Sequence, residues 1–109
     1  MAYDEGLAAL LRDDLAGMDG IGEKRMFGGL AFMLDGNMLC GVHPGGAMYR
    51  VGKDNAPFAL AVPGASPMEF TGRAMGGFVD VDDDAMIDDT RRARLLDLAL
   101  DFVRTLPPK

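Results

Sequence analysis

Two tight-turn signals constrain the fold of this chain more than any other feature of its sequence. The two signals are Asp35-Gly36-Asn37 and Pro44-Gly45-Gly46. Glycine, asparagine and aspartate readily adopt the backbone conformations of the short turns that join antiparallel strands. The turns separate three short apolar runs, which lie at 24–34, 38–43 and 47–51. The sequence therefore predicts an antiparallel meander of three strands over this segment.

Side chains alternate along a strand, and this alternation divides the third predicted strand between two faces. Tyr49 and Val51 fall on one face, which we assign to the core. Met48 and Arg50 fall on the opposite face. A sheet with one apolar face needs other elements to cover that face, and the segments on either side of the meander can supply them.

Amphipathic segments at both ends of the chain predict two covering helices. The segment 3–16 carries leucines at the i, i+3, i+4, i+8 spacing of a core-facing stripe, at Leu7, Leu10, Leu11 and Leu15. The segment 83–106 predicts one long helix, stopped by the prolines that follow it. Its apolar stripe is interrupted only by Arg91 and consists of Ile87, Leu95, Leu98, Phe102 and Leu106.

Weaker signals complete the predicted order of elements. Asn55 and Pro57 are typical of the start of a short helix. The segments 68–71 and 75–81 predict two more strands. The order α-β(3)-α-β(2)-α, with a mainly antiparallel sheet, predicts an α+β two-layer sandwich.

Length and charge bound the functional class. Residues 1–109 are expected to form a single domain, and no apolar run is long enough to span a bilayer. A single cysteine, Cys40, and an acidic start without a basic leader suggest a cytoplasmic protein without membrane association. The net charge of −6 argues against direct nucleic-acid binding and is consistent with a basic or neutral protein partner.

Two segments repeat a pattern of an arginine followed by two adjacent glycines. They are Arg25-Met26-Phe27-Gly28-Gly29 and Arg73-Ala74-Met75-Gly76-Gly77. One interpretation is a small-ligand site or an enzyme active site that holds an anion between the glycines and the two arginines. The other is structural, because glycine pairs in strands mark bulges or close backbone contacts. We favour the structural interpretation, since strands and not helix N-termini follow both pairs.

Other candidate sites are weaker. The aspartate run 80–84 has the spacing of a calcium loop, but Ala85 and Arg91 stand where such a loop needs glycine and glutamate. Cys40 and His43 are three residues apart in a strand, so they are expected on opposite faces and not as a catalytic pair. The only serine, Ser66, lacks the sequence context of a nucleophile. We therefore predict no catalytic, metal-binding or cofactor-binding residue.

Methionine is unusually frequent, with nine residues, and most lie in or beside predicted strands. Alternation places some of them on the sheet face away from the helices. They can fill the core, or they can form a surface for a partner protein or for a homodimer. The predicted partner surface consists of Ala31, Met33, Met48 and Arg50.

Several of these segments together resemble the N-terminal domain of the TfoX/Sxy family of bacterial competence regulators. The segments that carry the resemblance are Arg25-Met26-Phe27-Gly28-Gly29, Asp35-Gly36-Asn37-Met38, Met48-Tyr49-Arg50-Val51 and Met75-Gly76-Gly77-Phe78. The resemblance covers about residues 3 to 106 and implies a secretion-chaperone-like two-layer fold. It also implies a regulator that acts with another transcription factor and carries no catalytic residues. Compared with full-length members, the chain is expected to be a stand-alone form without the C-terminal domain.

Together these observations predict a non-enzymatic cytoplasmic protein-interaction module. The resemblance adds a role in transcription or competence regulation. The alternative is a small-ligand-binding protein or an enzyme that uses the region around Arg25 and Arg73.

Overall fold

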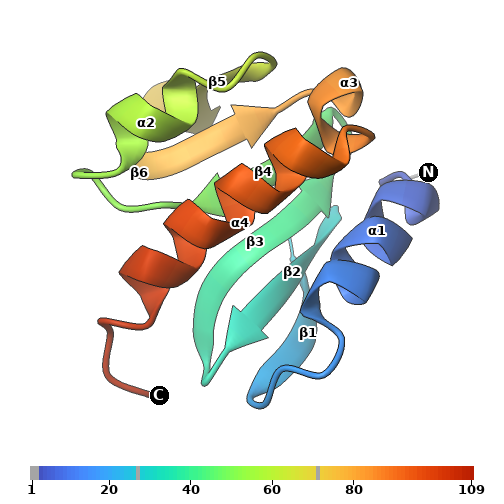
Figure 1. The fold of residues 1–109 in the computed structure, drawn as a ribbon, viewed down its shortest axis with the longest axis vertical. Coiled ribbons are helices and arrows are strands. Elements are labelled where there is room, and N and C mark those ends of the chain that lie inside the picture. Colours follow the sequence, from blue (N-terminus) through green and yellow to red (C-terminus); the bar gives the residue numbers. More distant parts are fainter. Residues whose placement is uncertain (1–2, 27, 71) are drawn as a thin grey trace.

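The computed structural model describes residues 3–26, 28–70 and 72–109. It contains a six-stranded antiparallel sheet with the strand order β1-β2-β3-β4-β6-β5, and helices that pack on one of its faces (Figure 1). The helices are α1 (Glu5–Leu15), α2 (Ala56–Leu60), α3 (Asp83–Met86) and α4 (Asp89–Val103). The strands are β1 (Ile21–Met26), β2 (Gly29–Leu34), β3 (Asn37–His43), β4 (Gly46–Arg50), β5 (Ala65–Phe70) and β6 (Arg73–Val81). The predicted α+β class with a helix layer on an antiparallel sheet is confirmed.

The sheet has one strand more than the predicted order. The single strand expected over 24–34 is a hairpin of β1 and β2, in which Met26 pairs with Gly29. Gly28 has a φ of +73°, a conformation that glycine adopts at little cost and that suits a tight reversal of the chain. Gly28 and Gly29, which the sequence pattern places inside one strand, therefore lie at the reversal between β1 and β2.

The C-terminal helix also differs from the prediction. The segment expected to form one helix over 83–106 is divided into α3 and α4, because Asp88 caps a new helix by accepting a hydrogen bond from the backbone N–H of Arg91 at 3.0 Å. Ile87, assigned to the apolar stripe, lies at this break and is 68% exposed. The buried arginine is Arg92, which is only 6% exposed.

The core lies between the sheet and the helix layer. α4 contacts β3 and β4, and α1 contacts β3 beside it (Figure 1). Tyr49 and Val51 are fully buried in this core, as predicted. Asn55 precedes α2 as predicted, but its side chain makes no capping bond and instead donates to the carbonyl of Leu98 in α4 at 3.2 Å. No helix among the described residues is long and apolar enough to cross a membrane.

Cys40 belongs to the same core and is expected to be chemically inert in the folded protein. Its side chain has no exposed surface, and burial raises the pKa of the thiol. Because the thiolate is the reactive form, a disulfide reagent such as dithionitrobenzoate should leave the native protein unlabelled at pH 8. One equivalent should react after unfolding in guanidinium chloride. Rapid labelling of the native protein would show that this part of the core opens readily.

Candidate functional site

The sheet face away from the helices carries apolar side chains that no helix covers. Ala31, Gly41 and Met48 are paired across β2, β3 and β4, and Met33 pairs with Met38 beside them. Ala31 has no exposed surface and Met48 is 9% exposed, although neither belongs to the core cluster under the helices. Their neighbours on this face bury them. Ala31, Met33 and Met48 therefore lie on this open face, and the partner surface made of these residues and Arg50 stays a prediction.

This open face contains a concave pocket of about 360 Å³, which we call the methionine pocket. Its main apolar side chains come from five strands and are Met26, Met38, Met48, Met68, Met75 and Phe78. The strands that supply Met26 and Met68 are the two edges of the sheet, so the sheet curves around the pocket. The acidic residues that line it are Glu69 and Asp80, and no lysine or arginine is among the described lining residues.

His43 lies at one end of the methionine pocket, where its two ring nitrogens have different partners. Nδ1 accepts a hydrogen bond from the backbone N–H of Gly45 at 3.0 Å. Nε2 therefore carries the proton in the neutral ring and donates to Asp80 Oδ1 at 2.7 Å. Cys40 lies in the core on the other side of the sheet, so the two residues lie on opposite faces as predicted.

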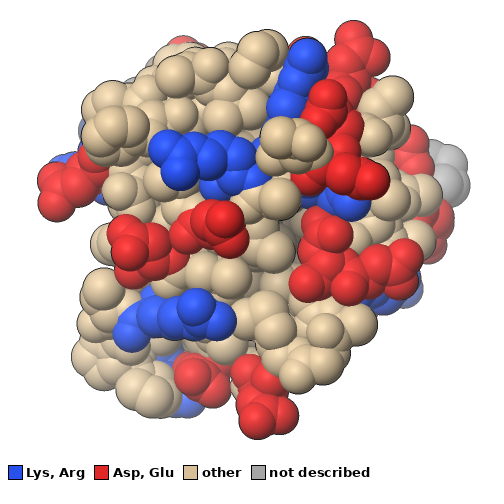
Figure 2. All heavy atoms as spheres, viewed as in Figure 1, with Lys and Arg blue, Asp and Glu red and all other residues tan. Residues whose placement is uncertain are grey.

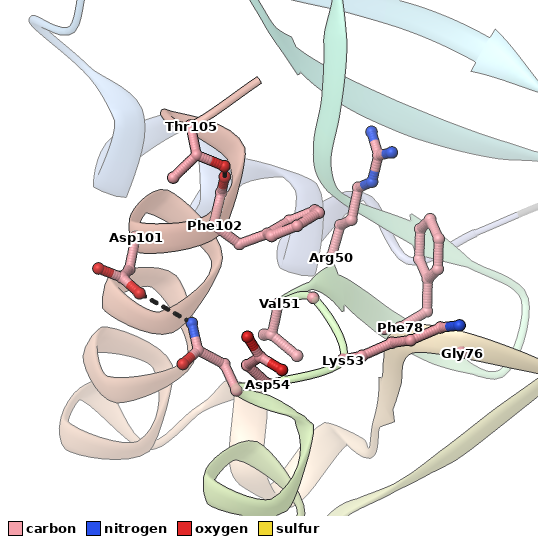
Figure 3. Close-up of a pocket in the computed structure, with 12 residues that line it drawn as sticks. Arg50, Val51, Lys53, Asp54, Gly76, Phe78, Asp101, Phe102 and Thr105 are labelled. Atoms are coloured by element: carbon pink, nitrogen blue, oxygen red, sulfur yellow. Dashed lines mark hydrogen bonds between the residues drawn. The ribbon is translucent and has the colours of Figure 1, made fainter.

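A second pocket, of about 520 Å³, lies between the end of β4, the middle of β6 and the C-terminal part of α4 (Figure 3). We call it the Arg50 pocket. The guanidinium carbon of Arg50 lies 5.8 Å from the ring centre of Phe78 and 5.6 Å from that of Phe102. Both distances are those of cation–π contacts. Among the described residues, no ion pair or hydrogen bond involves this guanidinium.

Charges of both signs line the Arg50 pocket on different sides. Figure 3 shows Arg50 and Lys53 toward Phe78, and the carboxylates of Asp54 and Asp101 toward the side of α4 and α2. The carboxylate of Asp101 accepts a hydrogen bond from Asn55 Nδ2 at 3.0 Å. The pocket therefore has a cationic side and an anionic side, with the aromatic ring of Phe102 between them.

The two glycine pairs have separate structural roles and do not form one site. Gly76 and Gly77 line the Arg50 pocket, whereas Gly28 and Gly29 belong to the β1–β2 hairpin and line neither pocket. Gly77 has a φ of +84°, and its carbonyl accepts hydrogen bonds from the backbone N–H groups of both Val51 and Gly52. This pattern is a bulge in the sheet, as the structural interpretation predicted.

The arginines of the repeated pattern do not converge on a pocket. Arg25 pairs with Leu30 on the edge strand β1, and Arg73 begins β6 at its turn with β5. Both are exposed, and neither lines either pocket. Because both side chains are exposed and line neither pocket, the structure does not support the anion site between the two arginines. Phe27, the remaining residue of the pattern, lies outside the described residues.

Two aspartates of the segment 80–84 have structural roles, because Asp80 pairs with His43 and Asp82 caps a helix. Asp82 accepts a hydrogen bond from the backbone N–H of Ala85 at 2.9 Å, at the start of α3. Among the described residues, no group of three or more histidine, cysteine, aspartate or glutamate side chains gathers as a set of metal ligands.

Sequence reasoning assigned Arg50 to an exposed face but missed the two rings beside it. Alternation along β4 gives the face of Arg50, whereas Phe102 comes from a helix far along the chain and had been assigned to the core stripe. The signal in the sequence was the Gly52-Lys53-Asp54-Asn55 turn directly after the strand. A turn of this composition carries polar groups at a strand end, where sites are often found.

Comparison with known proteins identifies a family. A family model described as the TfoX N-terminal domain matches residues 13–103. No curated protein and no solved structure gives a significant match to the chain.

Proposed function

The chain belongs to the TfoX N-terminal domain family, and from this premise we propose that it is a non-enzymatic cytoplasmic module that binds a partner protein through the methionine pocket. The observation that carries the proposal is the uncovered, curved sheet face with methionines on β1, β3, β4, β5 and β6. Methionine side chains are flexible and polarisable, so they adapt to apolar side chains of different shapes. Exposed apolar concavities of this kind are typical of interaction surfaces.

The partner that fits this surface is an amphipathic segment with apolar side chains flanked by lysine or arginine. Glu69 and Asp80 line the methionine pocket, and the chain as a whole has a net charge of −6. A basic segment would be attracted by the two acidic side chains and by the negative net charge, since complementary charges speed encounter and orient the bound partner. A second copy of the chain carries the same acidic charge, so homodimer formation through this face is disfavoured relative to a basic partner.

Direct nucleic-acid binding is not part of the proposed function. Figure 2 shows lysine and arginine side chains separated by acidic ones on the helix-covered face. A phosphate backbone is normally met by a continuous basic patch. The setting we propose for the contact is transcriptional regulation through another protein, and this part of the proposal rests on family membership alone.

A charge placed among the apolar side chains of the methionine pocket is expected to weaken peptide binding. Met38 is half-buried on β3 and lines the pocket. A Met38→Glu variant therefore puts a carboxylate among the apolar side chains of the pocket and not in the core under the helices. Affinity for a fluorescent amphipathic helix made of leucine and lysine should fall by at least about tenfold, because the apolar contact is lost. Fluorescence anisotropy at fixed ionic strength measures it.

The matched control is Ile87→Glu, which changes an exposed apolar residue at the α3–α4 break, outside the residues that line the pocket. This variant should bind like the unchanged protein. A peptide in which glutamate replaces lysine should bind more weakly than the basic one. Equal binding of the two peptides, or full binding by the Met38→Glu variant, would refute the proposal. Concentration-dependent self-association that blocks the peptide would assign the surface to a homodimer instead.

A further inference from the structure

The Arg50 pocket has a cation that lies beside two aromatic rings and has no anionic partner among the described residues. The ring centres of Phe78 and Phe102 lie 5.8 and 5.6 Å from the guanidinium carbon of Arg50, within the range of cation–π contacts. A guanidinium has five N–H donors, and cation–π contacts use its faces and leave the donors at its edge. Among the described residues no carboxylate pairs with it. The side chain is therefore preorganised to donate two hydrogen bonds to a carboxylate.

The other side of the pocket offers the complementary group. Asp54 is exposed, and no hydrogen bond or ion pair among the described residues involves its side chain. Figure 3 shows its carboxylate on the side of the pocket away from the guanidinium of Arg50. Carboxylates at this position disfavour a ligand that is only an anion. They favour a ligand that also has an ammonium group.

The space between the two charged sides suits a small apolar body. The pocket volume of about 520 Å³ lies within the range of small-molecule sites, about 300–1,000 Å³. Phe78 and Phe102 supply apolar walls, and the glycines at 52, 76 and 77 expose backbone without side chains. A Cβ atom added to Gly52 would lie 2.4 Å from the Phe102 ring, so glycine is needed there to keep this ring in place.

We propose that the Arg50 pocket binds a small zwitterion of the amino-acid class. The carboxylate of the ligand pairs with Arg50, with Lys53 as a second cation beside it. The ammonium group of the ligand faces Asp54, and the ligand side chain lies against Phe102. This site is separate from the methionine pocket, although Phe78 lines both.

The test is a titration of the ¹⁵N-labelled full chain with each standard amino acid in turn, followed by heteronuclear NMR. At least one amino acid should shift the amide signals of Gly52, Gly76 and Thr105, which line the pocket, in a saturable way. For that amino acid, the analogue without the amino group and the analogue without the carboxylate should each bind at least about tenfold more weakly. The proposal is overturned if no amino acid shifts these signals, or if either analogue binds as tightly as the zwitterion.

Substitution of Arg50 checks which residue holds the carboxylate. In an Arg50→Met variant the flexible side chain can still fill the space between the two rings, but the charge is lost. Affinity for the amino acid should fall about 10- to 100-fold, the usual loss for a charge-assisted hydrogen bond. The control is Arg94→Met on the exposed side of α4, which should bind normally. Should both variants bind alike while retaining native amide spectra, Arg50 does not hold the ligand and the proposal fails.

Discussion

An Arg92→Met variant is expected to lose about 3 kcal/mol of its free energy of unfolding, because one side chain joins three helices. The Nε and Nη2 atoms of Arg92 donate to the carboxylate of Asp14 in α1 at 2.6 and 3.3 Å. Nη1 donates to the carbonyl of Met86 in α3 at 2.8 Å, and Nη2 also reaches Asp89 at 2.9 Å. The side chain is 8% exposed and that of Asp14 21%. Its removal leaves a largely buried carboxylate and a carbonyl without their donor.

Urea-induced unfolding followed by circular dichroism measures this loss as a shift of the midpoint. The matched control is Arg91→Met, one residue earlier. Arg91 pairs with Asp88 at 3.6 Å with both side chains more than one-third exposed, so its loss should cost at most about 1 kcal/mol. An equal effect of the two substitutions would mean that the contact between α1 and α4 does not depend on Arg92.

A Gly29→Ala variant is expected to lose about 3 kcal/mol or to fail to fold, because there is no room for a methyl group. An added Cβ would lie 2.2 Å from the carbonyl oxygen of Val42 in β3, far inside normal contact. The obstacle is the backbone of a paired strand, so relief requires β2 and β3 to move apart. Thermal unfolding of the purified variant, with its two-dimensional amide spectrum as a check on the fold, tests the expectation.

The other glycines of the repeated pattern provide graded controls. A Cβ at Gly76 would lie 3.2 Å from the Lys53 side chain, which can move aside, so Gly76→Ala should change stability by less than about 1 kcal/mol. Gly28 has open space around it but a φ of +73°, so Gly28→Ala should cost about 1–2 kcal/mol through backbone strain. If Gly29→Ala were as stable as Gly76→Ala, close backbone contact would not explain the glycine in the first pair.

Local pattern was sufficient for the fold class and for the faces of the strands. The turn at Asp35-Gly36-Asn37 and the alternation along β4 gave the antiparallel pairing and the burial of Tyr49 and Val51. These features depend on neighbours within a few residues, so a single sequence contains them. The same reasoning failed within the segment 24–34, because a glycine pair fits a bulge in one strand as well as a turn between two.

The two pockets were beyond prediction from the sequence, because distant segments form them. Both edges of the sheet contribute to the methionine pocket, and the curvature that brings Met26 and Met68 to one concavity arises from the whole sheet. The Arg50 pocket depends on Phe102 in α4 lying against the end of β4. The spacing of residues along the chain does not predict such a contact between distant segments.

The sequence by itself determined that this chain forms helices packed on an antiparallel sheet, and which strand residues lie on the uncovered face. Turn composition and side-chain periodicity depend on residues close together in the chain, so they can be recognised in a single sequence. Only the tertiary structure decided that Arg92 and not Arg91 is buried, since the rotation of α4 depends on the helix break at Asp88 and on the position of Asp14 in α1. The tertiary structure also placed the two glycine pairs in separate parts of the sheet, because long-range packing sets the strand order.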